Sequence, residues 1–261
     1  MTTLTMYQVD AFASKLFTGN PAAVCPLKEW LTTETMQAIA LENNLSETVF
    51  FTGNNGKYHI RWFTPAAEVK LCGHATLASA YIIFTFLEPN INSIEFDSLS
   101  GPLHVTRKHE MIELDFPALP PTIIEKPDPT LLEAISIDPE VVLADMDYLV
   151  ILKNQQQIEN LQVDTGKLLK TDRRGVIFSA PSDEYDFVSR FFVPGLSVPE
   201  DPVTGSAHCV LTPYWAKRLN KNKLHAKQLS ARGGELLCEL VNDRVKLTGN
   251  AILFMKADIC I

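Results

Sequence analysis

The sequence lacks any apolar run long enough to cross a membrane. A spanning helix needs about 20 consecutive apolar residues. The longest apolar block, Ala75–Leu87, is interrupted by one serine and two threonines. The segment Met1–Met6 also lacks the basic and apolar regions of a secretory signal peptide. We therefore expect a cytoplasmic protein with no membrane partner.

A basic stripe is missing as well. Lysine and arginine number 23 against 31 aspartates and glutamates, which gives a formal net charge of −8. Nucleic acids and anionic membranes attract clustered basic residues. The pair Arg173-Arg174 is too short for such a cluster and is interpreted as a solvated turn. We expect no nucleic-acid partner, although a small anion can still bind at a locally positive site.

Cysteines are few and poorly spaced for pairing. There are five of them, and no two form a CxxC pair. The odd number argues against a disulfide framework, and the spacing argues against a structural zinc site. We therefore expect neither a disulfide framework nor a structural zinc site.

The apolar content of 46% is enough for a full core in 261 residues. Five prolines between Pro117 and Pro129 mark a boundary between two halves. The sequence thus predicts an N-terminal lobe, residues 1–116, and a C-terminal lobe, residues 117–250. A last strand within 251–261 is expected to return to the first lobe.

Alternating and helical hydrophobic patterns predict the elements of these lobes. Helices are expected at 33–43, 73–86 and 207–219, turns at 18–21 and 53–56, and strands at 7–12, 47–52, 57–63, 94–97, 103–107, 111–116 and 252–257.

The second half repeats the first. Gly73-His-Ala75 corresponds to Gly205-Ser-Ala207 at an offset of 132, and upstream Val49–Thr52 resembles Val176–Ser179. Each glycine begins a helix that is apolar all round and is therefore expected to be buried. The repeat is too long for a solenoid unit, so it indicates a duplicated domain whose strands wrap one helix.

The two helix starts at Gly73 and Gly205 are candidate binding sites. A helix N-terminus offers free N–H groups and partial positive charge to an anion. If the two equivalent starts face each other across the interface between the lobes, they can hold a substrate carboxylate and stabilise an enolate-like charge. The alternative is that each glycine only lets a buried helix begin tightly.

Three side chains near these starts are candidates for proton transfer. His74 lies on the first turn of its helix, although a lone histidine is more often structural. Asp201 precedes the second helix, where it is also a good turn former. Glu47 begins an apolar strand, and desolvation there would favour a general base. The residues alone favour an exposed strand-edge glutamate instead.

Cys72 suggests a thiol-based mechanism. A two-thiol racemase needs a second thiol at the equivalent position, and the offset of 132 places Thr204 there. Cys209 corresponds to the apolar Leu77, which indicates packing. The second thiol is thus missing where the repeat would put it.

Several sequence blocks together resemble the PhzF-like, or phenazine biosynthesis-like, family. The resemblance covers nearly the whole chain in order and is carried chiefly by these blocks: Gly19-Asn-Pro-Ala22, Ser46-Glu-Thr48, Cys72-Gly-His-Ala-Thr76, Asp201-Pro-Val-Thr-Gly-Ser206 and Arg232-Gly-Gly234. It implies an α+β, diaminopimelate-epimerase-like fold. Such a fold has two pseudo-symmetric lobes, each a mixed β-sheet rolled around a central α-helix.

The resemblance also implies an isomerase that moves a proton on a small carboxylate-bearing substrate without a metal or a cofactor. Members of the family are often homodimers. By motif, Glu47 is the catalytic acid–base group, and His74 and Asp201 assist it. The substrate-binding positions are Ser46, Gly73, Gly205, Ser206 and Asn20. A thiol-dependent racemase or epimerase and a non-catalytic binding protein of the same fold remain the alternatives.

Overall fold

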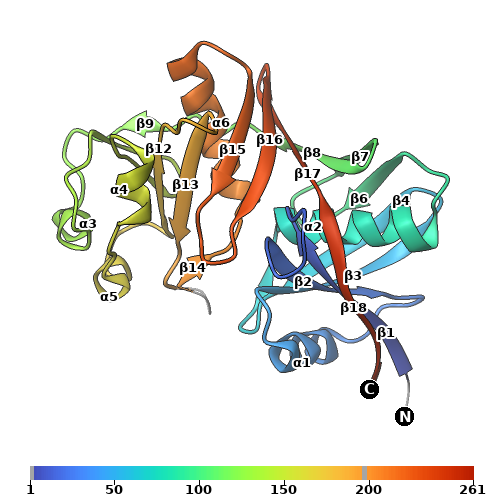
Figure 1. The fold of residues 1–261 in the computed structure, drawn as a ribbon. Coiled ribbons are helices and arrows are strands. Elements are labelled where there is room, and N and C mark those ends of the chain that lie inside the picture. Colours follow the sequence, from blue (N-terminus) through green and yellow to red (C-terminus); the bar gives the residue numbers. More distant parts are fainter. Residues whose placement is uncertain (1–2, 196–198) are drawn as a thin grey trace. The chain divides into compact units, whose positions relative to one another are not determined.

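The computed structural model describes residues 3–195 and 199–261 and divides into two compact units (Figure 1). The first unit comprises residues 1–115 and 248–261, and the second comprises residues 116–247. The lobes expected from the sequence differ by one residue at the first boundary and by three at the second. Each unit is described by itself below.

The first unit is a mixed sheet with two helices. Its helices are α1 (Thr33–Asn43) and α2 (Gly73–Ile82). Its strands are β1 (Thr3–Ala11), β2 (Asn20–Pro26), β3 (Glu47–Asn54), β4 (Lys57–Phe63), β5 (Glu68–Val69), β6 (Ser93–Asp97), β7 (Leu103–Lys108), most of β8 (Met111–Pro117), and β18 (Ala251–Cys260). β18 runs antiparallel to β1 along its whole length. The chain therefore returns to its first strand at its end.

Helix α2 is the centre of this unit. It is apolar on every side, and eight of its ten residues are buried. It packs against β1, β2, β3 and β18. The predicted helix over 73–86 is confirmed as far as Ile82, after which the backbone continues as a π-helical turn, Ile83–Leu87.

The predicted turn at 18–21 is wrong in its second half. Asn20 and Pro21 are the first residues of β2, paired with Ala11 and Asp10 of β1. The turn lies just upstream, where Gly19 has a φ of 70°. Asn-Pro favours turns locally, but pairing with β1 on one side and β3 on the other outweighs that preference here.

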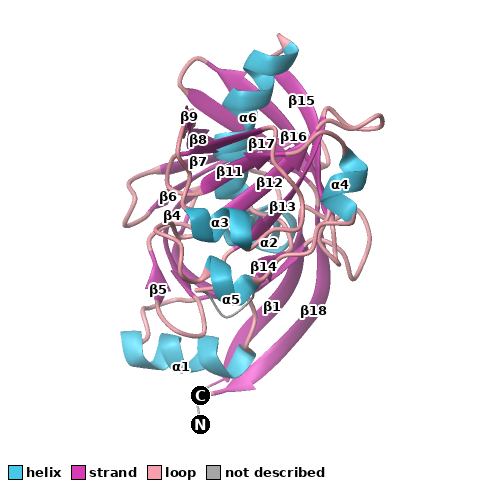
Figure 2. Cartoon of the chain, turned by 90° about the vertical axis from the view of Figure 1, so that its left-hand side faces the viewer, coloured by secondary structure: helices cyan, strands magenta, loops and turns pink. Residues whose placement is uncertain are grey.

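The second unit is a mixed sheet around helix α6 (Gly205–Leu219). Its other elements are β9 (Thr122–Ile123), β10 (Val141–Ala144), β11 (Tyr148–Ile151), β12 (Val176–Ala180), β13 (Phe187–Phe192), β14 (Glu200–Asp201), β15 (Lys223–Gln228), β16 (Gly234–Val241), most of β17 (Arg244–Gly249), α3 (Pro129–Glu133), α4 (Gln155–Glu159) and α5 (Thr165–Leu168). Figure 2 shows the helices and strands by class. The elements between β9 and α5 were not predicted.

Pro213 lies inside α6 without ending it. Proline has no N–H, so the carbonyl of Cys209, four residues earlier, loses its helical partner. The backbone N–H of Leu119 donates to that carbonyl at 3.0 Å. The helix can therefore continue to Leu219 because another segment satisfies the freed oxygen.

The two units repeat one strand topology. In the first, β2 and β3 are parallel, β3 and β4 antiparallel, and β4 and β6 parallel. In the second, β11 and β12, β12 and β13, and β13 and β15 have the same three relations. The repeat extends to side chains, because Arg61 binds Glu68 through two hydrogen bonds of 2.7 Å, and Arg190 binds Glu200 in the same way at 2.7 and 2.8 Å.

No helix among the described residues is both long and apolar enough to span a membrane.

Candidate active site

Parallel strands bring the first group of predicted site residues together. β2 begins at Asn20 and β3 at Glu47, and because the strands run parallel, their first residues lie at the same edge of the sheet. Helix α2 begins with Gly73 and His74 and packs against both strands. Ser46 is half-buried immediately before Glu47. One edge of the first unit therefore collects five of the eight predicted positions.

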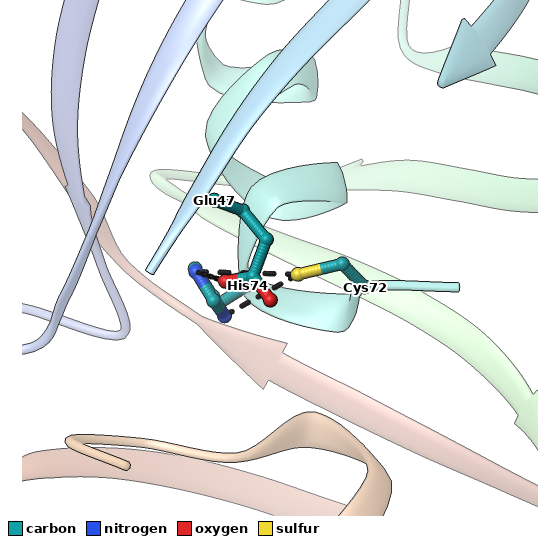
Figure 3. A group of neighbouring side chains, drawn as sticks. All are labelled: Glu47, Cys72 and His74. Carbon is teal, nitrogen blue, oxygen red and sulfur yellow. Dashed lines mark hydrogen bonds and ion pairs between the residues drawn. The ribbon is translucent and has the colours of Figure 1, made fainter. Parts of the chain in front are cut away.

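The side chains of this edge are in contact (Figure 3). Nε2 of His74 lies 3.1 Å from Oε2 of Glu47, in a pair that is 5% and 13% exposed. On the other side of the ring, Nδ1 of His74 lies 3.1 Å from Nδ2 of Asn20 and 3.5 Å from Sγ of Cys72. His74 is thus held between a carboxylate, an amide and a thiol.

The acidic neighbours set the protonation of the imidazole. Burial lowers the pKa of His74, but the charges of Cys72 in its thiolate form and of Glu47, with their hydrogen bonds to the ring, more than offset this and raise the pKa of His74 well above its ordinary value. This direction favours the imidazolium form of the ring, which lies beside Glu47. The Asn20 contact fits this state if Oδ1 faces Nδ1, which a rotation of the amide by 180° achieves.

The pKa of the Cys72 thiol is also raised, but for a thiol this favours the uncharged form. Burial, followed by the charge of Glu47, raises its pKa to about 11. A thiol with that pKa is protonated at neutral pH and is a poor nucleophile or base.

These residues also form a possible set of metal ligands. One donor atom from each of Glu47, Cys72 and His74 lies within 4.8 Å of the other two. Oxygen, sulfur and nitrogen donors of this kind suit zinc. Binding would require the Cys72 thiol to lose its proton, so a metal would compete with the proton chemistry of the same residues.

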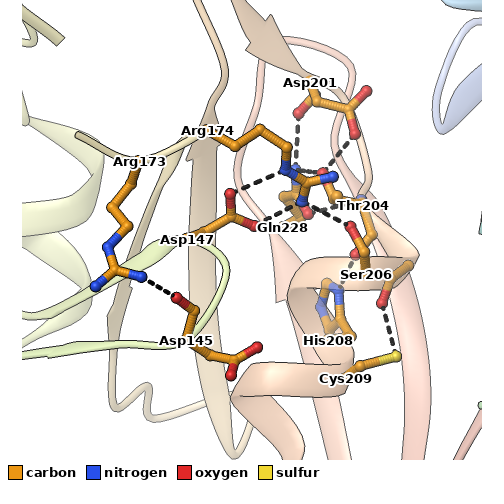
Figure 4. Close-up of polar contacts among 11 residues, drawn as sticks. Asp145, Asp147, Arg173, Arg174, Asp201, Thr204, Ser206, His208, Cys209 and Gln228 are labelled. Carbon is orange, nitrogen blue, oxygen red and sulfur yellow. Dashed lines mark hydrogen bonds and ion pairs between the residues drawn. The ribbon is translucent and has the colours of Figure 1, made fainter. Parts of the chain in front are cut away.

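The remaining predicted residues form a second group at the start of α6 (Figure 4). Thr204 Oγ1 donates a hydrogen bond to Asp201 Oδ2, and Thr204 N–H donates to Gln228 Oε1 at 2.9 Å. Gln228 Nε2 in turn donates to the carbonyl of Asp201 at 2.7 Å. Asp201 is therefore held beside Gly205 and Ser206, the first two residues of the helix.

Neither of these two helix starts has a side-chain cap. The residues before α2 and α6, Cys72 and Thr204, make no capping hydrogen bond. The N-caps of the other helices, Thr32, Asp128, Asn154 and Asp164, each accept one. A helix start without a side-chain cap can hold an anion, and anion binding at these two starts stays a prediction.

A residue that the sequence did not predict joins the second group. Arg174 donates from Nε and Nη2 to both oxygens of Asp147, at 3.0 and 2.6 Å, and from Nη2 to Ser206 Oγ at 3.3 Å. Asp147 is only 2% exposed, whereas Arg174 is 40% exposed. Arg174 is thus exposed, as the interpretation of Arg173-Arg174 as a solvated turn expects, but its ion pair with a buried carboxylate was not predicted. Arg173 donates to the Asp145 carbonyl at 2.6 Å.

The internal repeat of the sequence contained an indication of Arg174. The alignment of Val49 with Val176, carried two residues back, places Arg174 opposite Glu47. Arg174 and Asp147 precede parallel strands β12 and β11, just as Glu47 and Asn20 begin β3 and β2.

Comparison with known proteins agrees with these motifs. The model of the phenazine biosynthesis-like protein family matches residues 9–257. The chain belongs to the PhzF-like family. An isomerase of Pseudomonas aeruginosa, named as uncharacterized, is 50% identical over 252 residues, which are 97% of each protein. A PhzF-family crystal structure from Enterococcus faecalis is 44% identical and covers 100% of both chains, with a TM-score of 0.96.

A protein of another name shares the fold at low sequence identity. A hydroxyproline epimerase of Agrobacterium vitis, solved with bound trans-4-hydroxy-L-proline, superposes with a TM-score of 0.61 at 8% identity, over 98% of this chain and 92% of that one. This likeness concerns the fold alone. It confirms the expected diaminopimelate-epimerase-like α+β fold, and the named relatives confirm that this PhzF-like protein is an isomerase.

Proposed function

We propose that this PhzF-like isomerase moves a proton between two carbons of a small carboxylate-bearing substrate, with Glu47 as the base. The observation that carries the proposal is the state of Glu47 Oε2. This oxygen is buried, accepts no well-aligned hydrogen bond from any described side chain, and lies 3.1 Å from Nε2 of His74, whose pKa is raised. A carboxylate in this state can accept a proton while His74 stabilises the charge.

In the proposed reaction, Glu47 removes a proton from a carbon next to the substrate carboxylate. The uncapped N–H groups of α2 and α6 stabilise the anion that forms, as an oxyanion hole does. Glu47 then returns the proton to another carbon, with His74 and Asp201 assisting. No oxidant, metal or cofactor is needed, because the proton leaves and rejoins the same molecule.

The test is a screen of small cyclic and amino carboxylates for deuterium incorporation from D₂O. The wild-type protein should label at least one of them at carbon, because a proton held on Glu47 exchanges with solvent. Glu47→Gln should lower labelling by about 10²–10⁴-fold, the usual contribution of one acid–base group. Unfolding curves of the two proteins should agree.

Glu95→Gln is the matched control. Glu95 also faces a histidine, His104 at 3.7 Å, but that pair is 48% and 58% exposed. The Glu95→Gln variant should label substrate at the wild-type rate. Undiminished labelling by Glu47→Gln would refute the role of Glu47, and a failure of every carboxylate to label would refute the proposed reaction class.

A further inference from the structure

Glu47 and Arg174 take equivalent places in the two units. Each lies at or just before the second of two parallel strands, and each reaches the start of the central helix of its unit, at His74 and Ser206 respectively. At this repeated position, the first unit has the proposed base, Glu47, and the second unit has a cation, Arg174.

The backbone holds Arg174 close to the sheet. A Cβ on Gly175 would lie 2.7 Å from the Phe192 carbonyl and 2.8 Å from the Phe191 ring, so only glycine allows this close approach. The Arg174 guanidinium lies over the Phe191 ring, 5.7 Å from its centroid. The side chain is therefore placed by packing as well as by Asp147.

Several donors at this position have no hydrogen-bond acceptor within the described parts of the chain, although the charge of Asp201 also acts on Arg174. A guanidinium carries five N–H groups. Nε and Nη2 of Arg174 bind Asp147 and Ser206, which leaves both hydrogens of Nη1. Ser206 Oγ accepts from Arg174, so its own hydroxyl hydrogen also remains, beside the uncapped N–H groups of α6.

We infer that Arg174 binds the carboxylate of the substrate, together with Ser206 and the first turn of α6. The inference rests on the proposed function and adds a specificity-determining residue to it. Nη1 of Arg174 and the Ser206 hydroxyl are the donors, and Asp147 is a positioning residue that fixes the plane of the guanidinium. Ionised donors of this kind make the stronger hydrogen bonds to carboxylates.

Acetate serves as the probe, and acetamide is its uncharged counterpart. Each is titrated into the ¹⁵N-labelled full chain at constant ionic strength, and the Arg174 Nε–H and Ser206 N–H signals are followed by NMR. Acetate should shift both signals saturably, and acetamide should not. Absence of a saturable acetate shift at Arg174 would overturn the inference.

Variants separate binding from a structural role. Arg174→Lys keeps the charge but loses the forked donor geometry, so acetate should bind about tenfold more weakly. The charge-neutral double variant Arg174→Gln/Asp147→Asn should lose the saturable shift of Ser206. If the double variant does not fold, the acetate affinity of Arg174→Lys alone tests the inference. Wild-type affinity in Arg174→Lys would show a purely structural pair and overturn the inference.

Arg218→Lys is the matched control. Arg218 lies in the same unit, is 38% exposed, and pairs with Glu140 at 3.2 Å. The Arg218→Lys variant should bind acetate as the wild type does.

The titration involves no turnover, so a negative deuterium screen would refute the proposed function and leave this result standing. With a substrate in hand, Arg174→Lys should raise KM more than it lowers kcat, and Glu47→Gln should do the reverse.

Discussion

Oε2 of Glu47 lies 3.1 Å from Nε2 of His74, and both side chains are almost completely buried. A buried charge is costly unless an opposite charge faces it. The close approach therefore favours the protonated form of His74, at the edge of the sheet where β3 and α2 begin.

The first prediction concerns the pH dependence of turnover. Because the pKa of His74 is raised well above its ordinary value, the imidazolium persists through neutral pH and is lost on the alkaline side. The rate should fall there in the wild type, and His74→Gln should lower kcat by about 10²–10⁴-fold and remove that alkaline fall. His104→Gln, at an exposed histidine, should keep the wild-type profile.

The same pair links stability to pH. A histidine whose folded pKa is raised contributes stability that is present below the unfolded pKa of about 6.5 and is lost as pH rises through the folded pKa. The difference in unfolding free energy between wild type and His74→Gln should therefore change on the alkaline side only. An unchanged profile in both turnover and stability would contradict the ion pair.

His208 should act in the opposite direction. It is fully buried, its Nδ1 donates to the Thr204 carbonyl at 2.7 Å, and burial lowers its pKa to about 4. The unfolded chain therefore binds this proton first, and stability is lost as pH falls from about 6.5 to 4. The loss for this one group is roughly 3 kcal/mol at pH 4.

Urea unfolding at pH 7, 5.5 and 4 measures that loss. In His208→Gln the acid-side fall in unfolding free energy should be smaller by that amount, because glutamine does not titrate but can still donate to Thr204. Equal slopes in the two proteins would show that His208 is not the titrating group.

The third prediction concerns the thiol route. Because the pKa of Cys72 is about 11, iodoacetamide at neutral pH should modify the exposed Cys260 and leave Cys72 intact, as mass spectrometry of peptides will show. Cys72→Ser should keep turnover within several-fold of wild type. Loss of activity comparable to that of Glu47→Gln would instead favour the thiol-dependent racemase.

The fourth prediction concerns metal. Dialysis against EDTA should leave the rate of deuterium labelling unchanged if Glu47 works without a metal. Added Zn²⁺ should inhibit, because Glu47, Cys72 and His74 can bind it together and lose their proton chemistry. Cys72→Ser should weaken that inhibition. A rate that falls with EDTA and recovers with Zn²⁺ would show a metal-dependent enzyme.

Much of the fold follows from local sequence patterns. Helix α1 was predicted with its observed ends, because Thr32 caps its start and Asn44 ends it in the left-handed conformation. The short elements from β9 to α5 were missed, because strands of two to four residues and helices of four or five hold too few residues to show a period.

The candidate site also contains residues that the sequence predicted and one that it missed. The sequence placed Glu47 and His74 at starts of elements and Asn20 in a turn, and the parallel register of β2 and β3 brought the three together. Arg174 was missed because its partner, Asp147, is 27 residues away, and burial of that carboxylate cannot be read from either local segment.

By itself, then, the sequence determined the duplication, the two central helices and the family, since these depend on patterns along the chain. Only the tertiary structure decided that the pKa of His74 is raised, that Cys72 keeps its proton and that Arg174 is held beside Ser206. Charge and protonation depend on burial and on neighbours distant in sequence, and these exist only once the strands have paired.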